Sequence, residues 1–72
     1  MPQLNTLANR LRAARLHAGA TQTELAATAS LSRTTVSAAE AGLKTPARAT
    51  VILWALSCGV DSHWLFTGEE SK

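Results

Sequence analysis

The stretch TQTELAATASLSRTTVSAAEAG, from Thr21 to Gly42, constrains the fold more than any other part of the chain. It contains two segments of helical character, and helices shorter than about 12 residues are marginal on their own in water. A Leu-Ser pair at residues 31–32 separates them, and the second segment carries small hydroxyl side chains around a single arginine. Such short helices need packing partners, so the sequence predicts a small helical domain.

Capping signals define the two helices. Thr21 and Glu24 have the spacing of a capping box, which predicts a helix that begins at Gln22. Ser32 is placed to cap the next helix, over about 33–41. The inner positions of the two helices are predicted to be Leu25, Ala26 and Ala29 in the first, and Val36, Ala39 and Glu40 in the second.

The flanking segments are predicted to be helical too. Leu4, Leu7, Leu11 and Ala14 follow one helical face, which predicts a helix over 4–17 that ends near Gly19. Thr45 and Pro46 look like a cap and a first helical position, which predicts a helix over 46–58. Asp61 is placed to cap a last helix through about Phe66. We find no strand alternation, so the expected fold is all-α with five helices.

Composition narrows the classes of function. Seventy-two residues, 46% of them hydrophobic, make one domain. The single Cys58 forms no internal disulfide and is expected to be a small core residue, and the histidines lack zinc-site spacing. The longest apolar run, of about twelve residues, is below the roughly 18 that span a bilayer. We therefore expect a cytoplasmic protein without metal or other cofactor.

Charge is unevenly distributed along the chain. Six basic and two acidic side chains precede residue 49, whereas one basic and three acidic side chains follow it. This asymmetry favours a polyanionic partner for the first two-thirds of the chain. We find no catalytic serine elbow and no glycine-rich phosphate loop, and the serines and threonines fit helix caps and a presented face, so no enzyme is expected.

Several short motifs follow one another along the chain. They are Leu11, Arg15 and Gly19, then TQxELA at 21–26, SRxTVSxxExG at 32–42, Pro46, and GVDxxWLxTG at 59–68. In this order and spacing the chain resembles the Cro/CI-type (XRE family) helix-turn-helix regulators from about Leu7 to Gly68. The resemblance implies a lambda-repressor-like DNA-binding domain over 1–68, followed by an acidic flexible tail at 69–72. In such domains a short recognition helix enters the DNA major groove.

The resemblance also implies roles for individual residues. Base contacts are expected from Arg33, Thr34, Thr35, Ser37 and Ala38, and phosphate contacts from Gln22, Thr23, Ser32 and Lys44. Arg48 departs from the family, which commonly has an apolar residue there, but in the first turn of its helix it is expected to reach a phosphate. The guanidinium of Arg33 can donate two hydrogen bonds to the O6 and N7 atoms of a guanine. Arg15 and Glu40 match a structural salt bridge, with a phosphate contact by Arg15 as the alternative. Arg10 and Arg12 are expected to be solvated or to act as distant electrostatic contributors. Trp64 is expected to anchor the core, and Ser30 stands where the family often has a turn glycine.

The helix over 46–58 has two apolar sides. Val51, Trp54, Ala55 and Cys58 are predicted to face the core, whereas Leu53, Leu56 and Val60 fall on the opposite side. Together with Phe66 these three residues suggest a homodimer interface. The alternative is that the C-terminal segment folds over them within the monomer.

The sequence therefore predicts a transcriptional regulator that binds a palindromic operator in double-stranded DNA as a homodimer. The expected type is a repressor, Cro-like or similar to a restriction-modification controller, from a bacterium or phage, with no small-molecule ligand. Both a stand-alone regulator and the N-terminal domain of a longer repressor fit. The competing hypothesis is a protein-interaction module, such as an antitoxin-like protein, whose outer apolar helix face binds a different polypeptide.

Overall fold

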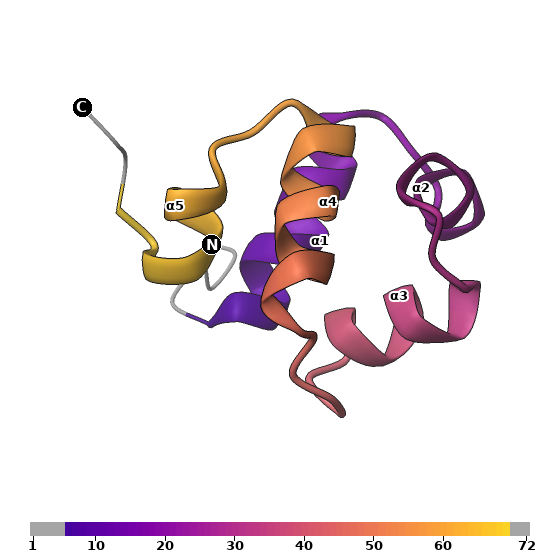
Figure 1. Cartoon of the computed structure of the whole chain (residues 1–72), viewed down its shortest axis with the longest axis horizontal. Helices are drawn as coiled ribbons and strands as arrows, with labels where there is room; N and C mark the ends of the chain where they lie inside the picture. The colour runs from indigo at the N-terminus through magenta and orange to yellow at the C-terminus, as the bar shows by residue number, and fades with distance from the viewer. Residues whose placement is uncertain (1–5, 70–72) are drawn as a thin grey trace.

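Helix α4 (Arg48–Cys58) runs through the middle of the molecule, in front of α1 (Leu7–His17) in Figure 1. Helix α5 (Ser62–Thr67) lies on one side of this pair, and α2 (Gln22–Ala29) and α3 (Arg33–Glu40) lie on the other. This computed structural model describes residues 6–69, over which there are five α-helices and no strand. The predicted all-α, five-helix fold is confirmed. The predicted position of Leu4, and residues 70–72 of the predicted tail, lie outside the described residues.

Two helices begin later than predicted. Helix α1 begins at Leu7 because Thr6 has an extended backbone and its Oγ1 accepts a hydrogen bond from the Asn9 N–H at 3.2 Å. Helix α4 begins at Arg48, with the extended Ala47 as its N-cap. Pro46 fixes its own φ but does not force the next residue into a helical turn. Helix α4 therefore begins two residues after its expected start at about residue 46, and α1 begins at Leu7 rather than at about residue 4.

The other predicted helix ends are observed. Thr21 and Glu24 form both bonds of the capping box, at 3.1 and 2.8 Å. Ser32 Oγ accepts the Thr35 N–H at 3.0 Å, and Asp61 caps α5. Helix α3 is followed by Gly42 in the left-handed region, at φ 75°.

The turn between α2 and α3 is closed by its own backbone. Ser30 takes a left-handed conformation, with φ 58° and ψ 40°. The next residue, Leu31, donates its N–H to the Ala26 carbonyl at 2.8 Å and packs against the core. Ser32 then starts α3 at once. This short connection holds α2 and α3 against each other.

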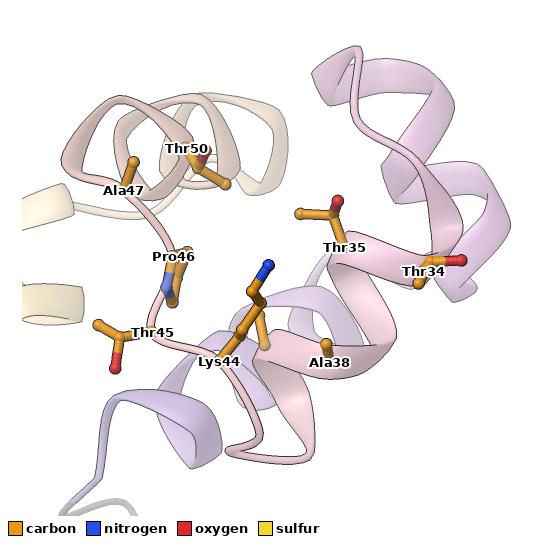
Figure 2. A pocket seen from close by; sticks show the side chains of 9 residues that line it. Thr34, Thr35, Ala38, Lys44, Thr45, Pro46, Ala47 and Thr50 are labelled. Carbon is orange, nitrogen blue, oxygen red and sulfur yellow. The ribbon is translucent and has the colours of Figure 1, made fainter.

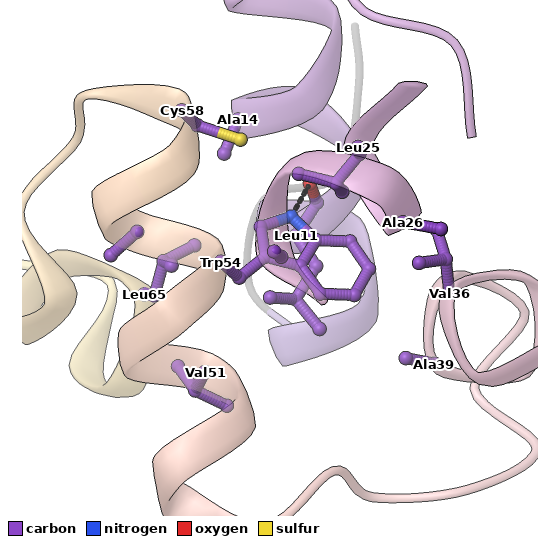
Figure 3. Close-up of a cluster of buried hydrophobic side chains, with 12 residues drawn as sticks. Leu11, Ala14, Leu25, Ala26, Val36, Ala39, Val51, Trp54, Cys58 and Leu65 are labelled. Carbon is purple, nitrogen blue, oxygen red and sulfur yellow. Dashed lines mark hydrogen bonds between the residues drawn. The ribbon is translucent and has the colours of Figure 1, made fainter. Parts of the chain in front are cut away.

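Trp54 is the centre of the hydrophobic core (Figure 3). Its side chain is fully buried, and its Nε1 donates a hydrogen bond to the Leu11 carbonyl at 3.0 Å. The side chains buried with it are Leu11, Ala14, Leu25, Ala26, Ala29, Val36, Ala39, Val51, Ala55, Cys58 and Leu65. Trp64, which was expected to anchor the core, is half-buried and packs against it, whereas Leu65 is fully buried and takes the inward position of α5. Burial raises the pKa of the Cys58 thiol.

Arg10 is buried, so the prediction that it is solvated is wrong. Only 6% of it is exposed. Its Nε donates to the Leu65 carbonyl at 2.9 Å and its Nη2 to the Phe66 carbonyl at 3.4 Å. These carbonyls belong to the last turn of α5, which has too few backbone partners of its own. Arg10 thus fastens the last helix to the first.

Residues 6–69 contain neither a membrane-spanning helix nor a cluster of metal-binding side chains. The longest helices have 11 residues, and none is long and apolar enough to cross a membrane. No group of three or more histidine, cysteine, aspartate or glutamate side chains lies close enough together to hold a metal ion.

Candidate nucleic-acid interface

Helix α3 has a buried side and an exposed side. Val36 and Ala39 are buried against the core, and Glu40 is half-buried. Four of the residues predicted to contact bases are exposed, namely Arg33, Thr34, Thr35 and Ser37, and the fifth, Ala38, is half-buried. The exposed side of α3 is therefore made of short side chains and one arginine.

Two open hollows flank this side of α3. The first, which we call the Lys44 hollow, has a volume of about 260 Å³ and lies between α3 and the start of α4 (Figure 2). The side chain of Lys44 extends between Thr35 and Pro46. The second, the Leu43 hollow, has a volume of about 290 Å³ and is lined by Arg33, Thr34, Ser37, Ala38 and Leu43. Thr34 and Ala38 line both hollows.

Arg33 and Lys44 are exposed cations without an internal role. Neither makes a hydrogen bond or ion pair with another residue in the described part of the chain, 6–69. The Ser32 hydroxyl, by contrast, lies 2.8 Å from the Thr35 hydroxyl and caps α3. Two cations beside a helix with short side chains suit a surface that binds nucleic acid, because phosphates attract cations and short side chains let the helix approach.

Glu40 joins three helices behind this surface. Its Oε2 accepts from Arg15 Nε at 2.6 Å and its Oε1 from Arg15 Nη2 at 3.0 Å. Arg15 Nη1 also donates to the Ala20 carbonyl at 2.9 Å. The side chains of Arg15 and Glu40 are only 11% and 4% exposed, and their hydrogen bond raises the pKa of Arg15 against the opposing effect of burial. This ion pair sets the position of α3 relative to α1.

Gln22 and Thr23 occupy the first turn of α2. The Gln22 side chain is half-buried, and its Nε2 donates to Glu40 Oε1 at 3.2 Å. Thr23 is exposed. The Gln22 amide therefore belongs to the network around Glu40, a role that the sequence did not indicate.

Arg48 is engaged within the molecule. Its guanidinium lies over the Phe66 ring, 4.9 Å from the centroid, which is a cation–π contact. To contact a phosphate as predicted, Arg48 must either leave the Phe66 ring or bind the phosphate while its guanidinium stays over the ring.

The four residues predicted for a dimer interface differ in exposure. Leu53 and Leu56 on α4 are 43% and 74% exposed. Val60 and Phe66 are half-buried and pack against the core. The prediction that Val60 continues the face of α4 is wrong, because the helix ends at Cys58 and the left-handed Gly59 turns the chain.

Leu43 is a surface residue beside α3 for which the sequence predicts no role. It is 80% exposed and borders α3. A single leucine after Gly42 belongs to no helical periodicity, so its only sequence signal is an apolar residue within a polar turn.

Comparison with protein families matches residues 11–65 to a family described as helix-turn-helix. The chain belongs to the XRE-type helix-turn-helix family. Among solved structures, it is similar to the crystal structure of the hypothetical transcription factor NHTF from Neisseria, with 33% identity and a TM-score of 0.79. That match covers 89% of this chain and 72% of the Neisseria chain. No curated protein matches the sequence.

The family membership confirms the resemblance inferred from the sequence, and the lambda-repressor-like fold with it. Helices α2 and α3 are the helix-turn-helix. The family and the Neisseria neighbour together support a DNA-binding regulator of transcription, in a family that is typically non-enzymatic.

Proposed function

We propose that this helix-turn-helix protein is a sequence-specific repressor that binds a palindromic operator as a homodimer in the cytoplasm. One observation carries the proposal: the exposed side of α3 presents Arg33 and short side chains, with Lys44 at its edge, and both cations are free of partners within residues 6–69. A dimer that occupies its operator represses by excluding other proteins from the same DNA.

We assign the two kinds of DNA contact to different parts of this surface. Arg33, Thr34, Thr35, Ser37 and Ala38 face the bases, and the bidentate fork of Arg33 suits guanine O6 and N7. Lys44, Thr23 and the first turn of α2 contact phosphates, which orient α3 in the groove without reading sequence. Ser32 and Gln22 also contact phosphates, through the hydrogen-bonding groups that their bonds within the protein leave free.

Dimerisation is supported by the exposed leucines of α4. Leu53 and Leu56 lie opposite the buried Val51, Trp54 and Ala55, so a second copy of the chain is a suitable cover for them. One recognition helix with two free cations binds weakly, whereas a two-fold dimer reads two half-sites about 34 Å apart.

Selection from a randomised duplex library, at one stated salt concentration, tests the proposal. We expect enrichment of a two-fold symmetric site and, in sedimentation, a dimer at tens of micromolar protein. A folded protein that enriches no sequence contradicts DNA reading. A monomer in solution that still binds DNA contradicts the homodimer and favours a different polypeptide on α4.

A further inference from the structure

The Leu43 hollow is lined in part by apolar groups, which cannot form hydrogen bonds with bases. Leu43 is the most exposed of the large hydrophobic residues in the described part of the chain, at 80%. It shares the hollow with Thr34 and Ala38, which have methyl groups, and with Arg33 and Ser37, which have hydrogen-bond donors. The hollow is thus lined by both apolar and hydrogen-bonding groups.

The backbone holds Leu43 in a defined place beside α3. Its N–H donates to the Ala38 carbonyl at 3.0 Å, across the left-handed Gly42. This bond closes the C-terminal end of α3 in the manner of a Schellman motif. The Leu43 backbone is therefore fixed relative to α3. Its exposed side chain can contact the same DNA as α3.

We infer that Leu43 is a specificity-determining residue that contacts the C5-methyl of a thymine in the operator. The inference rests on the proposed function. Thymine is the only base of ordinary DNA that projects a methyl group into the major groove, beside the hydrogen-bonding edges of its neighbours. The hollow has the same combination, with Arg33 as its hydrogen-bonding cation and with apolar groups from Leu43, Thr34 and Ala38.

Arg33 and Leu43 line the same hollow. We therefore expect the guanine read by Arg33 and the thymine read by Leu43 to lie close together, within one half-site of the operator.

The test removes the methyl and the leucine separately and together. Each thymine of the selected half-site is replaced in turn by deoxyuridine, which lacks only the methyl, and binding is measured for the unchanged protein and for Leu43→Ala. At one position we expect about a fourfold loss for the unchanged protein, the value of one buried methyl, and no loss for Leu43→Ala. Leu43→Met, which keeps an apolar side chain of similar reach, should retain the sensitivity.

Leu16→Ala is the matched control, because Leu16 is also exposed and lines neither hollow beside α3. It should respond to deoxyuridine as the unchanged protein does. Equal methyl effects with and without Leu43, or a Leu43→Ala loss that is the same on random DNA, would overturn the inference and leave the proposed function standing. Failure to select any site would overturn both.

Discussion

Arg10 in α1 donates a hydrogen bond from its Nε to the carbonyl oxygen of Leu65 in α5, at 2.9 Å and across 55 residues of sequence. The carbonyls at the end of a helix carry partial negative charge, which a buried guanidinium offsets. The left-handed Gly68 lies against the same arginine, since a Cβ at this position would be 3.2 Å from Arg10 Nη1. The last helix is thereby held by a charge as well as by Leu65 in the core.

Replacing Arg10 by alanine should therefore destabilise the domain. The variant leaves the Leu65 and Phe66 carbonyls without their guanidinium. Hydrogen bonds to charged groups contribute about 1.5–3 kcal/mol, so we expect the free energy of unfolding to fall by about 2–4 kcal/mol. Thermal unfolding followed by circular dichroism measures this, with Arg12→Ala as control because Arg12 is exposed. Equal melting temperatures for the two variants would contradict the assigned role.

Glu40→Gln should also destabilise the domain, since it leaves the nearly buried Arg15 guanidinium without its counter-ion. Breaking a buried pair from one side costs about 3–5 kcal/mol, and the neutral amide keeps part of the hydrogen bonding, so we expect a loss of about 2 kcal/mol in urea denaturation. Replacing both Arg15 and Glu40 by methionine should cost less than the sum of the single methionine replacements. Strict additivity would show that the two side chains act independently.

Ser30→Gly should stabilise the turn between α2 and α3. Ser30 is the only non-glycine residue with positive φ among residues 6–69, and this conformation costs an L-residue roughly 1–2 kcal/mol. We expect the variant to gain about 1 kcal/mol. Ala27→Gly, at an exposed helical position of α2, should instead lose about 1 kcal/mol. A loss in both variants would mean that the Ser30 side chain contributes more than its backbone costs.

Features that depend on neighbouring residues were predicted well. The capping box at Thr21, the Ser32 cap and the Asp61 cap each involve hydrogen bonds within a few residues. The starts at Thr6 and Ala47 were missed because capping chemistry is locally ambiguous: Thr6 is one of several possible caps, and Thr45-Pro46 resembles a cap without serving as one.

Features that depend on distant residues were not visible in the sequence. The burial of Arg10 requires the end of α5, and the Arg48 contact requires Phe66. The exposed side of α3 was predictable from its periodicity, whereas the place of Leu43 beside it depends on how the chain turns after Gly42. Local patterns thus identify the recognition helix, and tertiary packing decides which side chains surround it.

Leu53→Glu combined with Leu56→Glu should give a folded monomer. Both side chains are exposed, so the core around Trp54 is untouched, but carboxylates on a two-fold interface would face one another and be desolvated. Sedimentation should show the monomer, and affinity for the palindrome should fall by about a hundredfold, because linkage of two binding units is lost. Leu16→Glu should remain dimeric, and an unchanged dimer in the double variant would move the interface elsewhere.

Arg33→Ala and Lys44→Ala should weaken DNA binding in different ways. We propose that Arg33 contacts a base, so its loss should reduce affinity for the selected operator by about 1–3 kcal/mol per half-site and change affinity for random DNA far less. Lys44 is proposed to contact a phosphate, so its loss should weaken both DNAs alike and lower the slope of log affinity against log salt by about 1 per subunit. Fluorescence anisotropy at several salt concentrations separates the two effects. Equal losses on operator and random DNA for Arg33→Ala would contradict base reading by Arg33, and an unchanged salt slope for Lys44→Ala would remove Lys44 from the phosphate contacts.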